Sequence, residues 1–393
     1  MPAAARDMGP GFGPAAIPLN GRRALRLAVL RLVGQLRRPP ARPPQPRRIL
    51  VIRPDHMGDL IMASPALAAL RQAFPEAHLT AWVGPWGEPV WRGNPNLDAI
   101  EVCRFPGFTR VPKGGLGAPY QLAFKEARRL AGRFDLAINL RCDFWWGAMA
   151  ACWAGIPVAG HDVAECRPFL SLAVPYDGQL HEVDQNLALA AAAGGDSALS
   201  SRHPALADWW HDSAPGTEPP APAPDGAIAI HAGAGAAVKL WCEERWAAVA
   251  DALAPEAAVL FVAGSEEERD TAEHIRALMS QPAVVVSGLT IEQLAGLQRR
   301  CRLVLGVDNG PLHLAEALGR PTVALFGPAD PAKFGPYPGS QGVHEVVRLP
   351  WRCIPCGRLD YTQDELRYHL CVRLIDPTRV VQAARRALQP RQP

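Results

Sequence analysis

The sequence predicts an α/β protein built from two Rossmann-like, doubly wound domains that face a cleft. Three observations carry this prediction: short β-branched runs alternate with helical segments, the alternation occurs in two separate halves, and a Pro-rich stretch lies between them. Strands and helices that alternate in this way form parallel sheets with helices on both faces. The length of 393 residues is also too great for one ordinary core, so two domains are expected.

The first half opens with Ile49-Leu-Val-Ile52, an uninterrupted β-branched run that suits a parallel strand buried on both faces. A loop from Arg53 to Asp59 leads from this strand into a helix that ends near Phe74. The other elements expected in this half are strands at 78–83, 99–103 and 136–140 and a helix at about 122–132.

The second half repeats the alternation after residues 213–225, a Pro-dense stretch without periodicity that predicts an interdomain linker. In its clearest unit, the strand Leu303–Val307 meets a Gly-containing turn, and Pro311 then opens a short helix that Gly319 can close. The remaining expected elements are strands at 227–231, 258–263, 283–286 and 322–326 and helices at 243–253, 267–279 and 291–300. We therefore expect domains at 47–212 and 226–350, followed by a Cys-containing segment and a closing helix at 351–393.

Composition and charge argue against several classes of protein. The net charge is only +3, which argues against a general nucleic-acid binder. Nine cysteines, an odd number spread over the whole length, do not resemble a secreted disulfide framework, so a reducing cytoplasm is expected. No run approaches the roughly 18 to 20 apolar residues that span a bilayer.

Residues 1–46 form a basic, Pro- and Arg-rich extension that we expect to be partly disordered. Within it, apolar residues at positions 25, 29, 32 and 36 have helical spacing, and arginines at 22, 23, 26 and 31 accompany them. One interpretation is a basic amphipathic helix on an anionic membrane surface; the other is a helix packed on the protein body, or a frayed extension. Arginines interrupt the apolar stretch, which argues against a cleaved signal peptide.

The strand Leu303–Val307 and the helix after it predict a binding site for a nucleotide diphosphate. Backbone N–H groups at a helix start bind anions, and strand ends of an open α/β sheet converge on one crevice. Asn309, Gly310 and the N–H groups that follow are expected to meet phosphate oxygens. Asp308 would be repelled by a diphosphate, so we expect it to hold sugar hydroxyls. His313 can donate to a phosphate, although an isolated histidine is more often a packed or capping residue.

Two further positions are candidates for donor binding. Lys239 ends a Gly- and Ala-rich loop, residues 232–237, whose small side chains let the backbone approach a diphosphate; a lone lysine is otherwise usually a surface residue. Three glutamates follow a predicted strand at positions 266–268. We expect one of them to accept hydrogen bonds from ribose hydroxyls, and we choose Glu267. Alternatively, these glutamates only stabilise the first turn of a helix, where negative charge is favourable. We expect this role for at least two of the three.

Asp59 is the candidate general base. It lies where the loop after the first strand enters a helix, so its carboxylate can face a ligand over the sheet edge and deprotonate an attacking hydroxyl. The structural alternative is a helix N-cap, for which aspartate is a preferred residue. Asp55 and His56 lie on the same loop and compete for the role.

Cys353 and Cys356 form a CxxC pair, and His369 and Cys371 follow in the same segment. The spacing suits zinc, but a bare thiol pair or a disulfide fits as well, because the second half of the motif is irregular. No Asp-x-Asp motif follows a strand, so nothing indicates a metal-bound diphosphate. We therefore expect no metal and no other cofactor.

Two sequence blocks resemble glycosyltransferase family nine, the ADP-heptose:lipopolysaccharide heptosyltransferases. The first runs from Arg47 to Leu67 and contains Met57-Gly-Asp59; the second comprises residues 306–319 and 323–331. The resemblance implies a two-domain glycosyltransferase B-type fold, metal-independent transfer and inversion at the anomeric carbon. It further implies that Asp59 is the catalytic base and that the final helix, residues 377–388, crosses back to the N-terminal domain.

The same resemblance carries the nucleotide-sugar contacts onto this chain. They are Lys239, one of the glutamates at 266–268, Asp308, Asn309, Gly310 and His313. Many members of the family have threonine at the position of Asn309, but the asparagine amide can also donate and accept. The role implied for this position therefore remains chemically possible.

We therefore predict an inverting, metal-independent glycosyltransferase that moves a sugar onto a lipopolysaccharide core or a related glycan acceptor. Heptose from ADP-heptose is the leading donor. We expect a cytoplasmic enzyme, peripheral on the inner face of the cytoplasmic membrane through its basic N-terminal helix, with no nucleic-acid partner. A sugar-nucleotide epimerase of the same architecture and a non-catalytic nucleotide-sugar-binding protein are the alternatives.

Overall fold

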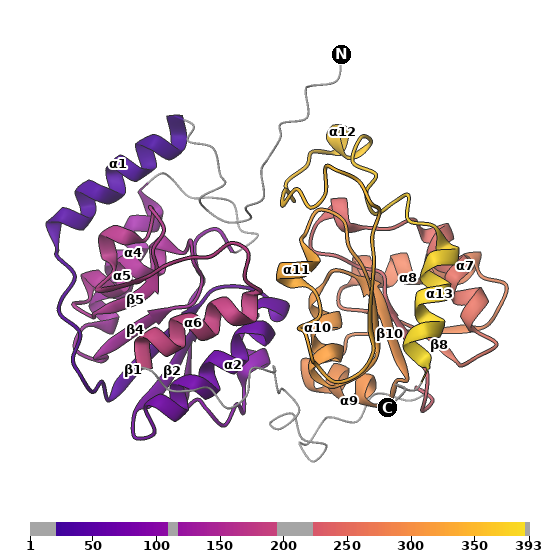
Figure 1. Ribbon diagram of the computed structural model, residues 1–393, viewed down its shortest axis with the longest axis horizontal. Coiled ribbons are helices and arrows are strands. Elements are labelled where there is room, and N and C mark those ends of the chain that lie inside the picture. Colours follow the sequence, from indigo (N-terminus) through magenta and orange to yellow (C-terminus); the bar gives the residue numbers. More distant parts are fainter. Residues whose placement is uncertain (1–20, 109–116, 195–222, 390–393) are drawn as a thin grey trace. The chain divides into compact units, whose positions relative to one another are not determined.

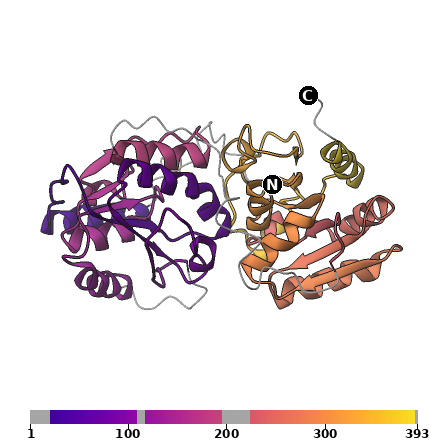
Figure 2. The same ribbon diagram turned by 90° about the horizontal axis from the view of Figure 1, so that it is seen from below.

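The computed structural model describes residues 21–108, 117–194 and 223–389. The chain divides between residues 202 and 203 into two compact units, here called the N-terminal unit and the C-terminal unit. Each unit contains one six-stranded parallel sheet flanked by helices (Figures 1 and 2). The predicted pair of doubly wound α/β domains is therefore confirmed. The predicted linker at 213–225 lies almost wholly outside the described residues.

In the N-terminal unit the strand order is β3-β2-β1-β4-β5-β6, and every neighbouring pair is parallel. The order reverses direction between β1 and β4, so their carboxyl ends form the topological switch point at which open α/β sheets bind ligands. The strands are β1 (Arg48–Arg53), β2 (His78–Val83), β3 (Ala99–Val102), β4 (Leu136–Asn139), β5 (Val158–His161) and β6 (Leu172–Val174).

The helix α2 is separated from β1 by three residues and is buried almost all round, as expected of a helix rich in Ala, Leu and Met. It packs most extensively against α6, which lies beside it (Figure 1). The helices of this unit are α1 (Gly21–Leu36), α2 (Met57–Ala73), α3 (Glu88–Trp91), α4 (Ala118–Leu130), α5 (Trp145–Trp153) and α6 (Glu182–Gly194), with a 3-10 turn η2 (Arg167–Phe169).

In the first half of the chain, the elements predicted from the sequence ended at residue 140. The prediction therefore lacked β5, β6, α5 and α6. The two strands have only 4 and 3 residues, which is too short for a periodic signal. α5 is buried over most of its length, from Trp146 to Cys152, so it shows no alternation between apolar and polar faces. These elements complete the sheet, and α6 contributes to the site described below.

The C-terminal unit repeats the design with the strand order β12-β11-β10-β7-β8-β9, again entirely parallel. Its switch point lies between β7 and β10. The strands are β7 (Ile228–His231), β8 (Val259–Ala263), β9 (Ala283–Ser287), β10 (Leu303–Val307), β11 (Thr322–Leu325) and β12 (His344–Val347). The helices are α7 (Glu243–Leu253), α8 (Glu266–Leu278), α9 (Ile291–Arg300), α10 (Gly310–Ala317), α11 (Pro331–Phe334), α12 (Gln363–Leu366) and α13 (Pro377–Leu388), with a 3-10 turn η3 (Ala237–Lys239).

The final helix, α13, has the predicted bounds. It packs on α7, which lies beside it in Figure 1, and on β11 and β12 of its own unit. Val380, Ala383, Ala384 and Ala387 are buried in the core of that unit, so the apolar face of the helix is already covered there. Within the described residues, no helix is long and apolar enough to cross a membrane.

Candidate functional site

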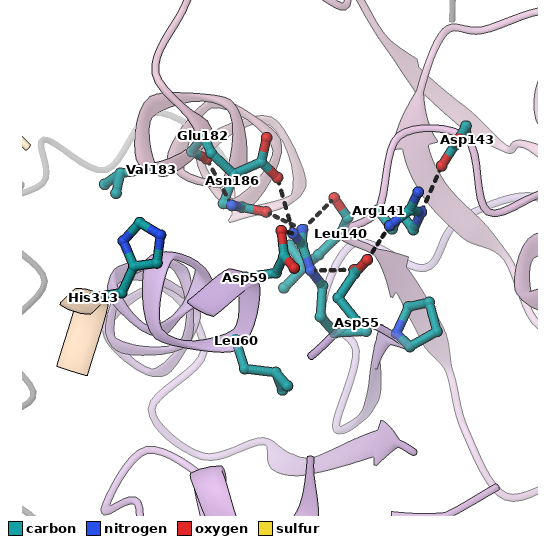
Figure 3. A network of polar contacts seen from close by, with 12 residues as sticks. Asp55, Asp59, Leu60, Leu140, Arg141, Asp143, Glu182, Val183, Asn186 and His313 are labelled. Carbon is teal, nitrogen blue, oxygen red and sulfur yellow. Dashed lines mark hydrogen bonds and ion pairs between the residues drawn. The ribbon is translucent and has the colours of Figure 1, made fainter. Parts of the chain in front are cut away.

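Arg53, the last residue of β1, organises the candidate site of the N-terminal unit. Only 1% of its surface is exposed. Its Nε pairs with Asp55 Oδ2 at 2.7 Å, and its Nη2 pairs with Glu182 Oε1 at 2.9 Å. Its Nη1 donates to Leu140 O at 3.1 Å and to Asn186 Oδ1 at 3.0 Å. Figure 3 shows these partners converging on one guanidinium from separate segments of the chain.

Local structure explains why these groups meet. The run Ile49–Ile52 is buried on both faces, so the charged residue that ends the strand must find polar partners. Glu182 and Asn186 stand one turn apart at the start of α6, where residues spaced by four share a face. Asn186 Nδ2 also donates to Glu182 O at 2.6 Å. The packing of α2 on α6 brings this helix face to the end of β1.

Asp59 lies at the edge of the Arg53 cluster (Figure 3). Its Oδ1 is 3.7 Å from Arg53 Nη2, and 36% of its side chain is exposed. It is the third residue of α2, whose N-cap is His56 without a side-chain cap hydrogen bond. The N-cap explanation for Asp59 is therefore wrong. His56 itself is exposed and faces Trp86, with 5.1 Å between ring centroids.

The surroundings of Asp59 make it a better proton acceptor than an ordinary aspartate. Burial raises its pKa first of all, and the Asp55 and Glu182 carboxylates add to this effect. Arg53 offsets only part of the increase, and the resulting pKa is about 6. Such a carboxylate is still mainly ionised at pH 7 but holds a captured proton more firmly than a free aspartate does, as a general base requires.

Asp55 has the opposite character. Burial alone would raise its pKa, but the guanidinium groups of Arg141 and Arg53 outweigh burial and hold the pKa below its ordinary value. Its side chain is 2% exposed and pairs with both arginines. Asp55 is therefore a buried, permanently charged partner of these arginines. Asp59, in contrast, combines a raised pKa with access to solvent.

Four residues of this cluster were not among the predicted site residues: Arg53, Arg141, Glu182 and Asn186. Arg53 carried a usable signal, because a charged residue that directly follows a buried strand has to be paired. Glu182 had none, since it lies 129 residues further along the chain, in a segment for which no elements were assigned.

In the C-terminal unit, Lys239 and Asp308 meet at the carboxyl ends of β7 and β10. Lys239 Nζ pairs with Asp308 Oδ2 at 2.6 Å and donates to Asp308 O at 3.3 Å. The two side chains are only 17% and 8% exposed, so this lysine is not a solvated surface residue. Its charge offsets the carboxylate that would otherwise repel a diphosphate at this position.

Asn309 is the N-cap of α10 and links two loops of the site. Its Oδ1 accepts from Leu312 N at 3.2 Å, and its Nδ2 donates to Gly233 O at 2.8 Å. Pro311 has no N–H, and the Leu312 N–H is occupied by this cap. Anion binding at this helix start therefore depends on the backbone N–H groups of Asn309 and Gly310. The sequence pattern had suggested more donors than these two.

His313 lies one turn into α10 between two carboxylates. Its Nε2 is 3.9 Å from Asp308 Oδ1, and its Nδ1 is 3.9 Å from Glu316 Oε2. Burial would raise the Glu316 pKa, but the hydrogen bond and charge of His313 and the Tyr337 N–H hold it below its ordinary value. His313 also lines a small pocket. The pocket's other lining residues are Asp308, Asn309, Leu312, Glu316, Thr322, Ala324, Phe326, Phe334, Gly335 and Pro336.

Among the glutamates at 266–268, Glu268 turns toward the loops of this site. Its Oε2 accepts from Gly264 N at 2.8 Å, and its Oε1 lies over Gly233, where an added Cβ would be 2.3 Å away. Glu267, the residue chosen from the sequence, is exposed in the first turn of α8. The geometry therefore favours Glu268 over Glu267 as the acceptor for a ribose.

The cysteine segment does not gather into an evident metal centre. Cys353 is exposed, whereas burial and the nearby Cys356 thiol raise the pKa of the buried Cys371 to about 11. His369 lies against Tyr361, with 3.8 Å between ring centroids. Over residues 21–108, 117–194 and 223–389, no three His, Cys, Asp or Glu side chains are arranged to hold a metal ion.

The chain is similar to one protein family and to curated members of it. A family profile described as glycosyltransferase family 9 (heptosyltransferase) matches residues 123–359, more than half of the chain. Lipopolysaccharide heptosyltransferase 1 of Pseudomonas aeruginosa is 27% identical over 333 residues, which are 79% of this chain and 86% of that protein. Lipopolysaccharide heptosyltransferase 1 of Escherichia coli K12 is 27% identical over 314 residues, which are 77% of this chain and 94% of that protein.

Two solved structures share the fold. The Escherichia coli ADP-heptose lipopolysaccharide heptosyltransferase II has a TM-score of 0.63 at 21% identity, covering 87% of this chain and 98% of that chain. The Escherichia coli heptosyltransferase WaaC with ADP-2-deoxy-2-fluoro heptose has a TM-score of 0.61 at 20% identity, covering 80% of this chain and 95% of that chain. At these identities the likeness establishes the fold alone.

Proposed function

The chain belongs to glycosyltransferase family 9, and on this basis we propose that it transfers heptose from ADP-heptose to a lipopolysaccharide core. Its relatives at 27% identity are lipopolysaccharide heptosyltransferases, which supports both the donor and the acceptor class. The observation that carries the mechanism is Asp59, a partly exposed carboxylate with a raised pKa at the switch point of the first sheet. An epimerase or a non-catalytic binding protein has no comparable support.

In the proposed reaction, Asp59 accepts the proton of the acceptor hydroxyl as that oxygen forms a bond to the anomeric carbon. The bond between this carbon and the diphosphate oxygen breaks at the same time, and the electron pair leaves with ADP. One base and a direct displacement invert the anomeric configuration. Proton transfer of this kind contributes a rate factor of about 10² to 10⁴.

We assign the leaving diphosphate to the C-terminal unit. The backbone N–H groups of Asn309 and Gly310 meet its oxygens, and the Lys239 ammonium and a hydrogen bond from His313 stabilise the negative charge that develops on it. Asp308, already neutralised by Lys239 at 2.6 Å, then accepts from sugar hydroxyls. In the proposed transfer, these hydrogen-bond donors and the Lys239 ammonium stabilise the leaving group in place of a metal ion.

Transfer assays with a lipid A–core acceptor and ADP-, UDP- or GDP-heptose test this function. We expect the acceptor to gain the mass of one heptose residue with the ADP donor. Transfer from the UDP donor alone would contradict the donor assignment. Conversion of the donor sugar in the absence of any acceptor would instead indicate an epimerase.

The pH dependence of transfer is expected to report the Asp59 pKa of about 6. Protonated Asp59 cannot accept the acceptor's proton, so kcat/KM should be constant above pH 7 and should fall about tenfold for each pH unit below 6. Initial rates between pH 4.5 and 8.5 measure this, with circular dichroism at each pH to establish that the protein stays folded. A midpoint near 4 would contradict the proposed environment of the base.

Replacing Lys239 by methionine is expected to weaken ADP binding by at least about tenfold, because a charge-assisted contact is lost and Asp308 is left without its cation. Isothermal titration calorimetry with ADP measures the change. Lys125→Met, at an exposed position on α4, is the matched control and should bind ADP as the wild type does. An unchanged affinity for Lys239→Met would exclude this lysine from the donor site.

Glu268 and Glu267 form a natural pair for testing the ribose contact. Glu268→Gln is expected to raise the Kd for ADP by about tenfold, since a charge-assisted hydrogen bond becomes a neutral one. Glu267→Gln, one residue earlier and exposed, should leave the Kd unchanged. A raised Kd for Glu267→Gln and an unchanged Kd for Glu268→Gln would instead assign the ribose contact to Glu267, as predicted from the sequence.

The proposed location is cytoplasmic and peripheral to the membrane. The acceptor of the relatives is a lipopolysaccharide, whose lipid portion lies in a bilayer. An enzyme that modifies such an acceptor gains from residence at the membrane surface, because its substrate is concentrated there. Fractionation of cells at low and high ionic strength tests this, with salt-dependent release from membranes as the expected result.

A further inference from the structure

The helix α1 has two different faces. Leu27 and Leu30 are buried, with 8% and 0% of their surface exposed. Gly34 lies directly against Pro168 of η2, where an added Cβ would be 2.6 Å from the proline Cβ. Arg23 pairs with Glu165 at 2.7 Å. These contacts fix one face of the helix on the body of the N-terminal unit.

The opposite face is apolar and exposed. Leu25, Leu32 and Leu36 are 67%, 62% and 78% exposed, and their spacing of seven and four residues places them on one side of a helix. At 100° per residue this side points away from the side that contains Leu27 and Leu30. Burial in the core therefore does not explain these three leucines. We call them the outer face of α1.

The charged residues of α1 are all arginines. α1 contains no acidic residue, and Arg26 and Arg31 are exposed on its two flanks. Arg38, also exposed, follows the helix. A row of leucines bordered by arginines matches the headgroup region of an anionic bilayer, where leucines enter the acyl boundary and guanidinium groups meet phosphates.

Two other occupants fit less well. A second copy of the chain would bring the arginines of two outer faces together, and like charges oppose such pairing. Residues 1–20 contain one arginine and one aspartate, so they offer no net negative charge to complement the helix. The positive charge therefore selects an anionic partner.

We propose that α1 docks the protein on an anionic phospholipid surface, with Leu25, Leu32 and Leu36 inserted and Arg26 and Arg31 on lipid phosphates. The helix is held on the body by its other face, so docking requires no unfolding. This role is separate from the transfer chemistry and would hold for any sugar donor.

The test uses the full-length protein and sedimentation with vesicles of phosphatidylethanolamine and phosphatidylglycerol, or of phosphatidylcholine alone. Wild-type protein is expected to bind the anionic vesicles and to be released by salt. Leu25→Ser/Leu32→Ser/Leu36→Ser should lose at least about tenfold in binding, because its insertable apolar surface is gone. Arg26→Gln/Arg31→Gln should lose about fivefold for each charge.

A matched control replaces three exposed leucines of the C-terminal unit, Leu278, Leu359 and Leu374, by serine. It should bind vesicles as the wild type does. All variants should keep the wild-type Tm and the wild-type rate of transfer to a water-soluble, lipid-free acceptor fragment. This rate separates a failure of docking from a failure of the proposed enzyme activity.

Several results would overturn the proposal. Equal vesicle binding by the outer-face variant and the wild type would exclude insertion, and equal binding to neutral vesicles would exclude the anionic partner. Binding that appears only when vesicles contain the lipopolysaccharide acceptor would assign the interaction to substrate recognition. A wild-type dimer that dissociates in the outer-face variant would assign this face to self-association.

Discussion

Replacing Asp59 by asparagine is expected to lower kcat for sugar transfer by about 10³-fold while leaving the Kd for ADP unchanged. Asparagine has nearly the same shape but cannot accept the proton of the acceptor hydroxyl. The donor contacts assigned above come from other residues, so binding should survive. Single-turnover transfer rates and calorimetry with ADP measure the two quantities on the same protein.

The same substitution is expected to stabilise the fold at pH 7. The pKa of Asp59 is raised from 3.8 to about 6, so its effect on stability is favourable below pH 4 and is lost as the pH rises through 6. The difference between the two pKa values corresponds to about 3 kcal/mol in the free energy of unfolding. The side chain is 36% exposed, and solvent screening reduces this contribution to about 1 kcal/mol. Urea unfolding should show Asp59→Asn as the more stable protein at pH 7 and as equal to the wild type at pH 4.

Asp143→Asn is the matched control, because this aspartate is also 36% exposed and also pairs with an arginine of the cluster, Arg141. It should retain transfer within a few-fold of wild type. If Asp59→Asn transferred sugar at the wild-type rate, the base assignment would be wrong. If both variants lost activity equally, the charge of the cluster rather than a proton acceptor would be responsible.

The fold could be predicted where apolar runs are long and uninterrupted. Leu303–Val307 matches β10 residue for residue, because a short apolar run that ends in a turn is typical of a buried parallel strand. The strands between residue 140 and the linker were not predicted, for the opposite reason. Strands such as Val158–His161 are too short to show a period. The position of β5 is set by pairing with β4 and that of β6 by pairing with β5, and local sequence does not encode such long-range contacts.

Some residues of the candidate site could likewise be predicted from the sequence, and others could not. Lys239, Asp308 and Asn309 could be predicted from their places at strand ends, because topology brings such positions together. The geometry favours Glu268 over the predicted Glu267. One step along a helix turns a side chain by 100°, so the helical phase cannot be read from three successive glutamates. The partners of Arg53 were missed because Glu182 meets it only through the packing of two helices.

Replacing Arg53 by methionine is expected to destabilise the protein by about 3 to 5 kcal/mol. Methionine fills similar volume, but Asp55 and Glu182 would lose the cation that compensates their burial. Arg48→Met, on the same strand, is the matched control: Arg48 pairs with Asp135 but is 49% exposed, so its loss should cost at most about 1 kcal/mol. Urea unfolding of both variants at pH 7 measures the difference.

The cause can be isolated with a second substitution. If uncompensated charge is responsible, Glu182→Gln in the Arg53→Met background should restore part of the stability, with a coupling energy of about 1 to 3 kcal/mol. Additive losses would contradict this and would indicate a packing defect instead. Arg53 also lowers the pKa of Asp59, so its removal should move the midpoint of the pH–rate profile above 6. A purely structural arginine would change the stability and leave that midpoint in place.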